Sequence, residues 1–135
     1  MASDNHWRVR VLVVEDFEPF SRFVRSTLGN RSGFQIVGEV SDGLEAVRKA
    51  GELQPDLILL DIGLPTMNGI EAARQIRRLS PQSKIIFVTQ ESDPAVVQEA
   101  LSLGAAGYLR KMRVATDLLN ALDAVLDGRQ FLSAA

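Results

Sequence analysis

The stretch Val11-Leu12-Val13-Val14-Glu15-Asp16 decides the fold, because four apolar residues in a row change abruptly to two acids. Three later apolar runs end in a similar way: residues 57–60 before Asp61, residues 85–88 before Thr89, and Tyr108-Leu109 before Arg110 and Lys111. Apolar runs without alternation are typical of strands buried on both faces, as in a parallel sheet covered by helices. The carboxyl ends of such strands lie along one edge of the sheet. We therefore expect these polar side chains to meet in one crevice, where open α/β sheets bind ligands.

Amphipathic segments with start and stop signals lie between the apolar runs. Pro19 suits a first helical turn and Gly29 a helix end, while Asp42 followed by Glu45 has the form of a capping box. A further apolar segment, residues 34–40, is expected to be the remaining strand. Five helices are expected: at residues 18–29, from the Asp42 cap to about Leu53, from Asn68 to about Leu79, from Asp93 to Gly104, and from Ala115 to Gly128.

The alternation of strands and helices predicts a single α/β domain. Strand-helix pairs that recur at intervals of about 22 to 28 residues imply right-handed crossovers and a five-stranded, doubly wound parallel sheet with five helices. The chain has 135 residues, which is near the modal domain size, whereas an eight-fold barrel needs nearly twice that length. We place the domain at residues 9–127, after a lead of residues 1–8. Residues 128–135 are expected to be a C-terminal tail or the start of a linker.

The composition excludes several classes of protein. With 15 basic and 17 acidic side chains the net charge is -2, so the chain has no electrostatic footprint for nucleic acid. It contains no cysteine, which excludes disulfides and thiolate metal sites. The single histidine, His6, is expected in a solvated lead. No segment has the form of a signal peptide or the length of a membrane span, so the predicted location is the cytoplasm, with no membrane partner.

The polar residues at the strand ends resemble those of the receiver domains of two-component response regulators. Their motifs are the pair Glu15-Asp16, the loop Asp61-Ile62-Gly63-Leu64-Pro65-Thr66-Met67-Asn68-Gly69, Thr89, and Tyr108 three residues before Lys111. The resemblance covers the chain from about Val9 to Leu126 and implies a flavodoxin-like fold with strand order 2-1-3-4-5. It also implies phosphorylation of Asp61 by a sensor histidine kinase. A receiver is not an enzyme, although it takes part in its own phosphorylation and dephosphorylation.

A magnesium site is expected among the acids. A carboxylate is a competent nucleophile toward a phosphoryl group, but two anions approach each other readily only when a cation screens them. Mg²⁺ prefers oxygen ligands and is commonly held by one or two carboxylates together with a phosphate. We expect Asp16 and Asp61 to bind it directly, and the resemblance adds the backbone carbonyl of Gly63 as a third ligand and Glu15 through a water. The competing interpretation is a helix cap at Asp61 and two solvated loop acids.

Two further residues are expected to act on the phosphoryl group, and one to respond to it. Lys111 would pair with Asp61 before the reaction and with a phosphoryl oxygen afterwards, and Thr89 would donate its hydroxyl to another such oxygen. The resemblance implies that movement of Thr89 lets the ring of Tyr108 turn inward. This would change the surface of the fourth helix, fifth strand and fifth helix, which is expected to mediate homodimerisation or partner docking. The alternatives are a threonine that satisfies a backbone group, a surface lysine and a packed ring.

Two positions depart from the usual receiver pattern. Gln90 follows the threonine, where a small residue is common, and is expected to crowd the approach of a phosphodonor. Met112 follows the lysine, where a proline in a cis peptide is common. Because a cis bond without proline costs about 2.5 to 4 kcal/mol, we expect the Lys111–Met112 bond to be trans and the approach path of the lysine to be altered.

The segment Asp127-Gly128-Arg129-Gln130-Phe131-Leu132-Ser133 resembles the exit of NarL/FixJ-type receivers toward a helix-turn-helix output domain. No such domain follows in this sequence, so DNA binding is expected only through that absent output domain. An excised regulatory module of a transcription factor is favoured over a stand-alone receiver. Two other functions remain open: a receiver-like interaction module that accepts no phosphate and, less favoured, a magnesium-dependent phosphatase of the haloacid dehalogenase kind. The phosphatase chemistry wants a second aspartate two residues after the first, where this chain has Gly63.

Overall fold

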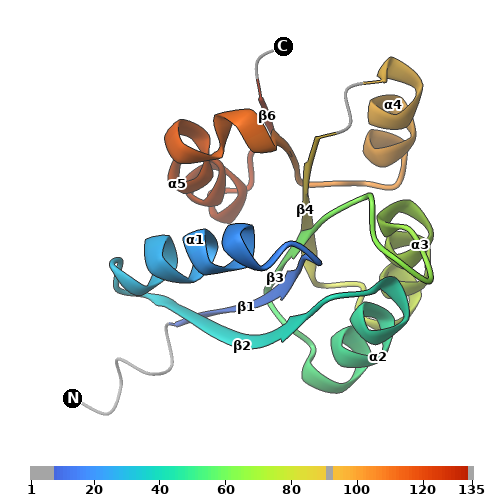
Figure 1. Cartoon of the computed structure of the whole chain (residues 1–135), viewed down its shortest axis with the longest axis horizontal. Coiled ribbons are helices and arrows are strands. Elements are labelled where there is room, and N and C mark those ends of the chain that lie inside the picture. The colour runs from blue at the N-terminus through green and yellow to red at the C-terminus, as the bar shows by residue number, and fades with distance from the viewer. Residues whose placement is uncertain (1–7, 91–92, 134–135) are drawn as a thin grey trace.

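The computed structural model describes residues 8–90 and 93–133, and shows a parallel sheet with helices on both faces (Figure 1). The strands are β1 (Val9–Val14), β2 (Phe34–Val40), β3 (Leu57–Leu60), β4 (Lys84–Thr89), β5 (Gly107–Arg110) and β6 (Phe131–Leu132). The helices are α1 (Glu18–Gly29), α2 (Gly43–Leu53), α3 (Gly69–Leu79), α4 (Pro94–Ser102) and α5 (Val114–Leu126), with a 3₁₀ turn, η2 (Lys111–Arg113), before α5. The strand order is β2-β1-β3-β4-β5-β6. The fold is therefore of the predicted flavodoxin-like α/β class.

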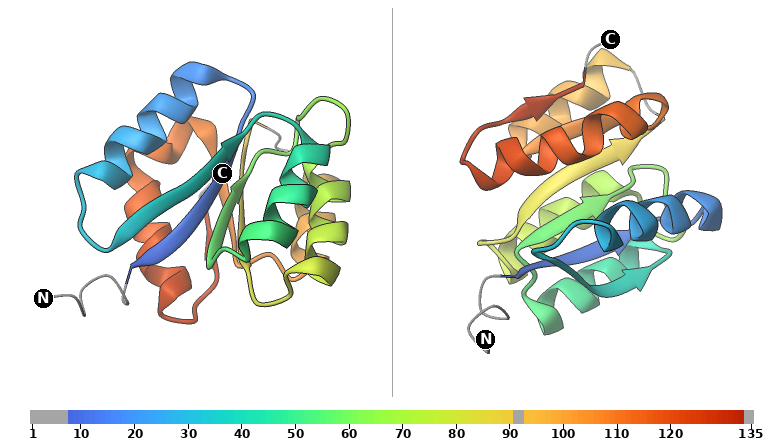
Figure 2. Two further views of the ribbon diagram at one scale, coloured as in Figure 1. Left: turned by 90° about the horizontal axis from the view of Figure 1, so that it is seen from below. Right: turned by 90° about the vertical axis from the view of Figure 1, so that its left-hand side faces the viewer.

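Strands β1 and β3 lie inside the sheet, and the side chains of β1 alternate between two apolar cores. Val11 and Val13 pack in one core with residues of α1 and α5, whereas Leu12 and Val14 pack in the other with residues of α2 and α3. Figure 2 shows the corresponding layers, with α1 and α5 on one face of the sheet and α2, α3 and α4 on the other. Because both faces are covered, both sets of alternating residues are apolar. This explains the unbroken apolar runs in the sequence.

The predicted starts of α2, α3 and α4 are confirmed by side-chain caps. An oxygen of each capping residue accepts a hydrogen bond from a backbone N–H group in the first turn: Asp42 from Glu45 (2.8 Å), Asn68 from Glu71 (3.0 Å), and Asp93 from Ala95 (2.9 Å). Pro19 lies in the first turn of α1, as predicted. These caps satisfy N–H groups that have no partner within the helix.

In the part of the chain that the structure describes, the sheet has six strands, so the prediction of five was wrong. The additional strand, β6, has two residues and pairs in parallel with β5, with Leu132 opposite Tyr108. Ser133 continues the pairing: its N–H donates to the carbonyl of Tyr108 at 2.9 Å, and its hydroxyl accepts from the N–H of Arg110 at 3.1 Å. A two-residue strand has no hydrophobic period of its own. Its presence depends on the edge that β5 offers, which the local sequence does not reveal.

Three other expectations concern the Lys111–Met112 peptide bond, His6 and membrane-spanning segments. Among residues 8–90 and 93–133 no peptide bond is cis, so the Lys111–Met112 bond is trans, as predicted. His6, expected in a solvated lead, lies outside the described residues. Within the described ranges, no helix combines the length and the apolar content needed to cross a membrane.

Candidate functional site

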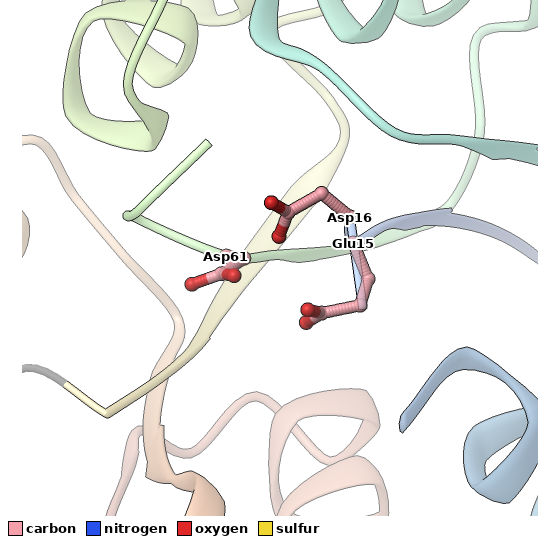
Figure 3. Close-up of side chains that lie close together, drawn as sticks. All are labelled: Glu15, Asp16 and Asp61. Carbon is pink, nitrogen blue, oxygen red and sulfur yellow. The ribbon is translucent and has the colours of Figure 1, made fainter. Parts of the chain in front are cut away.

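Three carboxylates meet at the carboxyl edge of the sheet. Glu15 and Asp16 directly follow β1, and Asp61 directly follows β3, the neighbouring strand. The two strand ends are level, because Val14 pairs with Leu60 and the N–H of Asp61 donates to the carbonyl of Val14 at 3.1 Å. One oxygen of each carboxylate lies within 4.8 Å of the others. Figure 3 shows the three carboxylates turned toward a common space.

Lys111, at the start of η2, binds two of these three acids. Its Nζ donates to Oε2 of Glu15 at 2.8 Å and to Oδ2 of Asp61 at 3.3 Å. Glu15 and Asp61 are buried, whereas Asp16 is exposed. The lysine therefore reaches Asp61 although a trans bond follows it, and its shorter contact is with Glu15. Among the described residues one ammonium, that of Lys111, contacts this cluster of three carboxylates, which leaves an excess of negative charge at this edge.

This arrangement shifts the pKa of two groups. Burial raises the pKa of Glu15 above its ordinary value of 4.5, and the negative charge of Asp61 adds to the rise, while the hydrogen bond from Lys111 opposes it. Burial also disfavours the charged form of Lys111, but the hydrogen bond to Glu15 and the charge of Asp61 outweigh that effect. The pKa of Lys111 is therefore raised above its ordinary value of 10.5. Both directions fit a buried site with more carboxylates than ammonium groups.

The loop after Asp61 is held in place by the starts of α2 and α3. The N–H of Gly63 donates to Oδ1 of Asp61 at 3.2 Å. A Cβ on Gly69, the first residue of α3, would lie 2.1 Å from the backbone oxygen of Asp61, so only glycine permits this approach. Thr66 has a φ of 65°, and its hydroxyl donates to Oδ1 of Asp42, the cap of α2, at 3.3 Å. The loop thus fixes the backbone that carries the Asp61 carboxylate.

A pocket of about 460 Å³ opens beside Asp61. Its lining includes five of the predicted site residues together with Gln90: Asp16, Asp61, Gly63, Thr89 and Lys111. Thr89 is buried at the end of β4, and Gln90, the next residue, is exposed. The pocket therefore joins two carboxylates, one hydroxyl and one ammonium in a space open to a ligand.

Tyr108, the remaining predicted residue, lies apart from this pocket. Its side chain is buried in β5, and it lines a second pocket of about 370 Å³ together with Val97 of α4 and Leu132 of β6. The structure thus places Tyr108 against the surface that the sequence links to partner docking. Tyr108 is not among the residues that line the pocket beside Asp61.

The chemistry of the cluster fits a hard divalent cation. All of its anionic donors are carboxylate oxygens, which Mg²⁺ prefers, and the adjoining pocket leaves room for water or phosphate as further ligands. Asp16 and Asp61 both line the pocket, whereas Oε2 of Glu15 accepts hydrogen bonds from Lys111 and from the N–H of Phe17 at 3.1 Å. The two aspartates are thus the acids with the most open access to an ion.

Two aromatic side chains beside the cluster were not predicted as part of it. Phe17 lines the pocket although it is 58% exposed, and the ring centroid of Phe20 lies 4.8 Å from Nζ of Lys111. The available signal was the recurrence of phenylalanine at positions 17, 20 and 23, directly after the acidic pair. Because Phe20, Phe23 and Val24 follow one another at helical spacing, the sequence alone indicates a packing role for Phe20.

Comparisons with known proteins agree with this geometry. The family model of the response regulator receiver domain matches residues 11–123. The response regulator GacA of Pseudomonas viridiflava is 34% identical over 125 residues, which cover 93% of this chain and 58% of GacA. The chemotaxis protein CheY of Thermotoga maritima is 36% identical over 116 residues, which cover 86% of this chain and 96% of CheY.

A similar receiver has also been solved. The signal receiver domain of the response regulator NarL from Mycobacterium tuberculosis matches with a TM-score of 0.84 and 32% identity, covering 90% of this chain and 98% of that one. This chain therefore spans nearly all of a single receiver but little more than half of GacA. The family match extends over most of the sequence and includes the strand ends that carry the acids, Thr89 and Lys111. The chain belongs to the response regulator receiver domain family of two-component signalling, as its strand-end residues predicted.

Proposed function

We propose that this domain is a phosphorylation-dependent switch in which Asp61 accepts a phosphoryl group from a sensor histidine kinase. The observation that carries the proposal is the setting of the Asp61 carboxylate. It is buried, lies 3.3 Å from Nζ of Lys111 and within 4.8 Å of two other carboxylates, and lines an open pocket. The competing role as a helix cap is disfavoured, because Asn68 caps the helix that follows.

The proposed transfer uses the carboxylate of Asp61 as the nucleophile. One of its oxygens attacks phosphorus, the bond from phosphorus to the donor imidazole breaks, and an acyl phosphate forms. The electron pair of the broken bond goes to the imidazole nitrogen, which takes up a proton. Lys111 stays charged, in keeping with its raised pKa, and can move its hydrogen bond from Asp61 to a phosphoryl oxygen. The hydroxyl of Thr89, on the same pocket, is proposed to donate to another of these oxygens.

Mg²⁺ is the proposed cofactor, held directly by Asp16 and Asp61, with the backbone carbonyl of Gly63 as third protein ligand and Glu15 acting through a water. When bound, the ion supplies positive charge that screens the carboxylate from the incoming phosphoryl group. The excess of carboxylates over ammonium groups supports this assignment. Acids so close together are costly to keep ionised unless a cation is present.

The signal is proposed to leave through the surface of α4, β5 and α5. Thr89 is the last residue of β4, and Tyr108 lies on the neighbouring strand β5, opposite Phe87. Because the two residues lie near each other in the sheet, a movement of Thr89 is proposed to change the packing of the Tyr108 ring. Such a switch shifts the balance between two existing states, and partial activity without phosphate is expected. We propose homodimerisation through this surface and transcriptional control through an output domain beyond this sequence. GacA, which this chain covers by 58%, supports the longer architecture.

Intact mass measurement tests the proposed function. The protein is incubated with Mg²⁺ and acetyl phosphate, beside Asp61→Asn and the exposed control Asp127→Asn. We expect wild type and the control to gain one phosphoryl group and Asp61→Asn to gain none. A wild type without mass gain would instead indicate a receiver-like interaction module. Sustained release of phosphate without a labelled protein would indicate a phosphatase, which the glycine at position 63 argues against.

A further inference from the structure

Lys111 has a third neighbour besides the two carboxylates, the ring of Phe20. Nζ of Lys111 lies 4.8 Å from the ring centroid, within the range in which the face of an aromatic ring attracts a cation. Phe20 lies in the first turn of α1, where its N–H donates to the carbonyl of Phe17 at 3.0 Å. It is half-buried and packs against the apolar core beneath α1 and α5. The ring is therefore held by the helix and the core rather than by the lysine.

A lysine at this position needs external support. Its stem has four flexible carbons, and its ammonium is a point charge without directional preference. The following residue gives little support, because Met112 is 79% exposed and its sulfur lies 3.7 Å from a guanidinium nitrogen of Arg110. Glu15 is the nearer carboxylate, at 2.8 Å against 3.3 Å for Asp61. The contacts with the two acids alone would thus hold the ammonium nearer to Glu15 than to Asp61, the proposed phosphoryl acceptor.

The ring can restrain the ammonium without competing for its charge. A carboxylate partner offsets the positive charge and can take up a proton, whereas an aromatic ring is neutral and does not titrate. The ammonium of Lys111 has three N–H donors, and it donates hydrogen bonds to Glu15 and Asp61. A ring on another side limits the positions that the ammonium can reach while its charge remains available to a phosphoryl oxygen.

We propose that Phe20 is a positioning residue for Lys111, which holds the ammonium at the Asp61 carboxylate through a cation–π contact. This inference rests on the proposed phosphorylation of Asp61. Phe20 touches neither the phosphoryl group nor Asp61 in this scheme, and it acts only through the lysine. The contact restricts the orientation of the Lys111 side chain, and the ring that makes it belongs to α1.

Three variants separate this role from packing. Phe20→Leu keeps an apolar side chain but removes the ring, Phe20→Tyr keeps the ring, and Phe23→Leu removes a neighbouring ring whose centroid lies 6.4 Å from that of Phe20. We expect Phe20→Leu to slow the initial phosphorylation by acetyl phosphate roughly threefold to tenfold. Phe20→Tyr is expected to restore the rate to within about twofold, and Phe23→Leu to leave it unchanged. Thermal unfolding of each variant shows how much of any change comes from stability.

The NMR signal of the lysine side chain reports the contact directly. The chain has only three lysines, Lys49, Lys84 and Lys111, so their εCH₂ signals are readily assigned. We expect the signal of Lys111 to be shifted upfield by the Phe20 ring in wild type and Phe20→Tyr, and to lose that shift in Phe20→Leu. Packing alone would not produce this pattern.

The outcomes are distinguishable. A wild type that takes up no phosphate overturns the proposed function. If wild type reacts and Phe20→Leu reacts equally fast, or Phe23→Leu is slowed as much, the role of Phe20 is overturned while the proposed function stands. A Lys111 signal that coincides with those of Lys49 and Lys84 in wild type also overturns the role of Phe20.

Discussion

Polar side chains are buried at both ends of the sheet, but those at the amino end are neutral and hydrogen-bond to one another, whereas those at the carboxyl end include charged groups. At the amino ends of β3 and β4, Ser80 and Ser83 are almost wholly buried and neutral, with hydroxyls 2.6 Å apart. Ser83 also donates to the carbonyl of Pro55 at 2.5 Å. At the carboxyl ends, two buried carboxylates share the single ammonium of Lys111, and a third stands beside them on an open pocket.

This difference separates a stabilising polar network from a functional one. Buried neutral groups that hydrogen-bond to one another stabilise a fold, and they leave no unpaired group to bind a ligand. An excess of like charges lowers stability and is relieved by a counterion or by protonation. The polar groups at the amino end thus satisfy one another, whereas the carboxyl end retains an unfavourable charge arrangement, which the proposed cation and phosphoryl group would use.

The largest change in stability is expected from Lys111→Met. The variant leaves two buried carboxylates without their shared ammonium, and losing one partner of a buried pair costs about 3 kcal/mol. We expect chemical denaturation at neutral pH to show this loss, and added Mg²⁺ to recover part of it. The control is Lys49→Met, which removes a surface pair with Glu52 at 3.7 Å and should cost less than about 1 kcal/mol. Equal stability of Lys111→Met and wild type would contradict the idea of a strained charged end.

At the opposite end of the sheet, Ser83→Ala is expected to lower the free energy of unfolding by about 1 to 3 kcal/mol. The variant leaves the carbonyl of Pro55 buried without its side-chain donor. Phosphorylation by acetyl phosphate should proceed at the wild-type rate in the folded variant. Ser102→Ala, which removes an exposed hydroxyl bonded to Glu99, is the matched control and should stay within about 0.5 kcal/mol of wild type. A slower phosphorylation of Ser83→Ala would show that the two ends are not independent.

A smaller effect is expected on how the free energy of unfolding depends on pH. Because the pKa of Glu15 is raised in the folded protein, the folded state binds more protons than the unfolded state as pH rises above 4.5. The stability that Glu15 contributes is therefore present below that pH and is lost as pH rises through the raised pKa. We expect Glu15→Gln to remove this decline in urea denaturation measured with a metal chelator. Glu18→Gln is the control of opposite sign, because Arg25 lowers the pKa of Glu18.

The smallest effect is expected at the rim of the pocket. Gln90→Ala should speed phosphorylation by acetyl phosphate about threefold, because a shorter side chain leaves more room for the donor. Gln98→Ala changes an exposed glutamine on α4, away from the acids, and should not alter the rate. If the rate falls in Gln90→Ala, the glutamine assists the donor instead of crowding it.

The sequence was most informative where local pattern and function coincide. The apolar runs that end in Glu15, Asp61 and Thr89 predicted both the buried strands and the edge at which these residues meet. Caps such as Asp42 and Asn68 were predictable because their partners are only three residues away. Local signals of this kind need no knowledge of the tertiary structure.

Contacts across the crevice could not be predicted in the same way. The choice of Glu15 as the nearer partner of Lys111, and the approach of Phe20 to the same lysine, depend on how α1 and η2 lie over the edge of the sheet. The pairing of Leu132 with Tyr108 depends on an unpaired edge of β5. In each case the partners are far apart in sequence, and no periodic pattern marks them.

The most direct test of the central claim is to locate the phosphoryl group chemically. Protein treated with Mg²⁺ and acetyl phosphate is reduced with borohydride, which converts an aspartyl phosphate to homoserine, and its tryptic peptides are sequenced by mass spectrometry. We predict homoserine at position 61 alone, in the peptide spanning residues 50–74, and none when Mg²⁺ is chelated. Reduction at another carboxylate, or at none, would contradict the claim that the acids at the carboxyl edge of this sheet form a phosphoryl-accepting site.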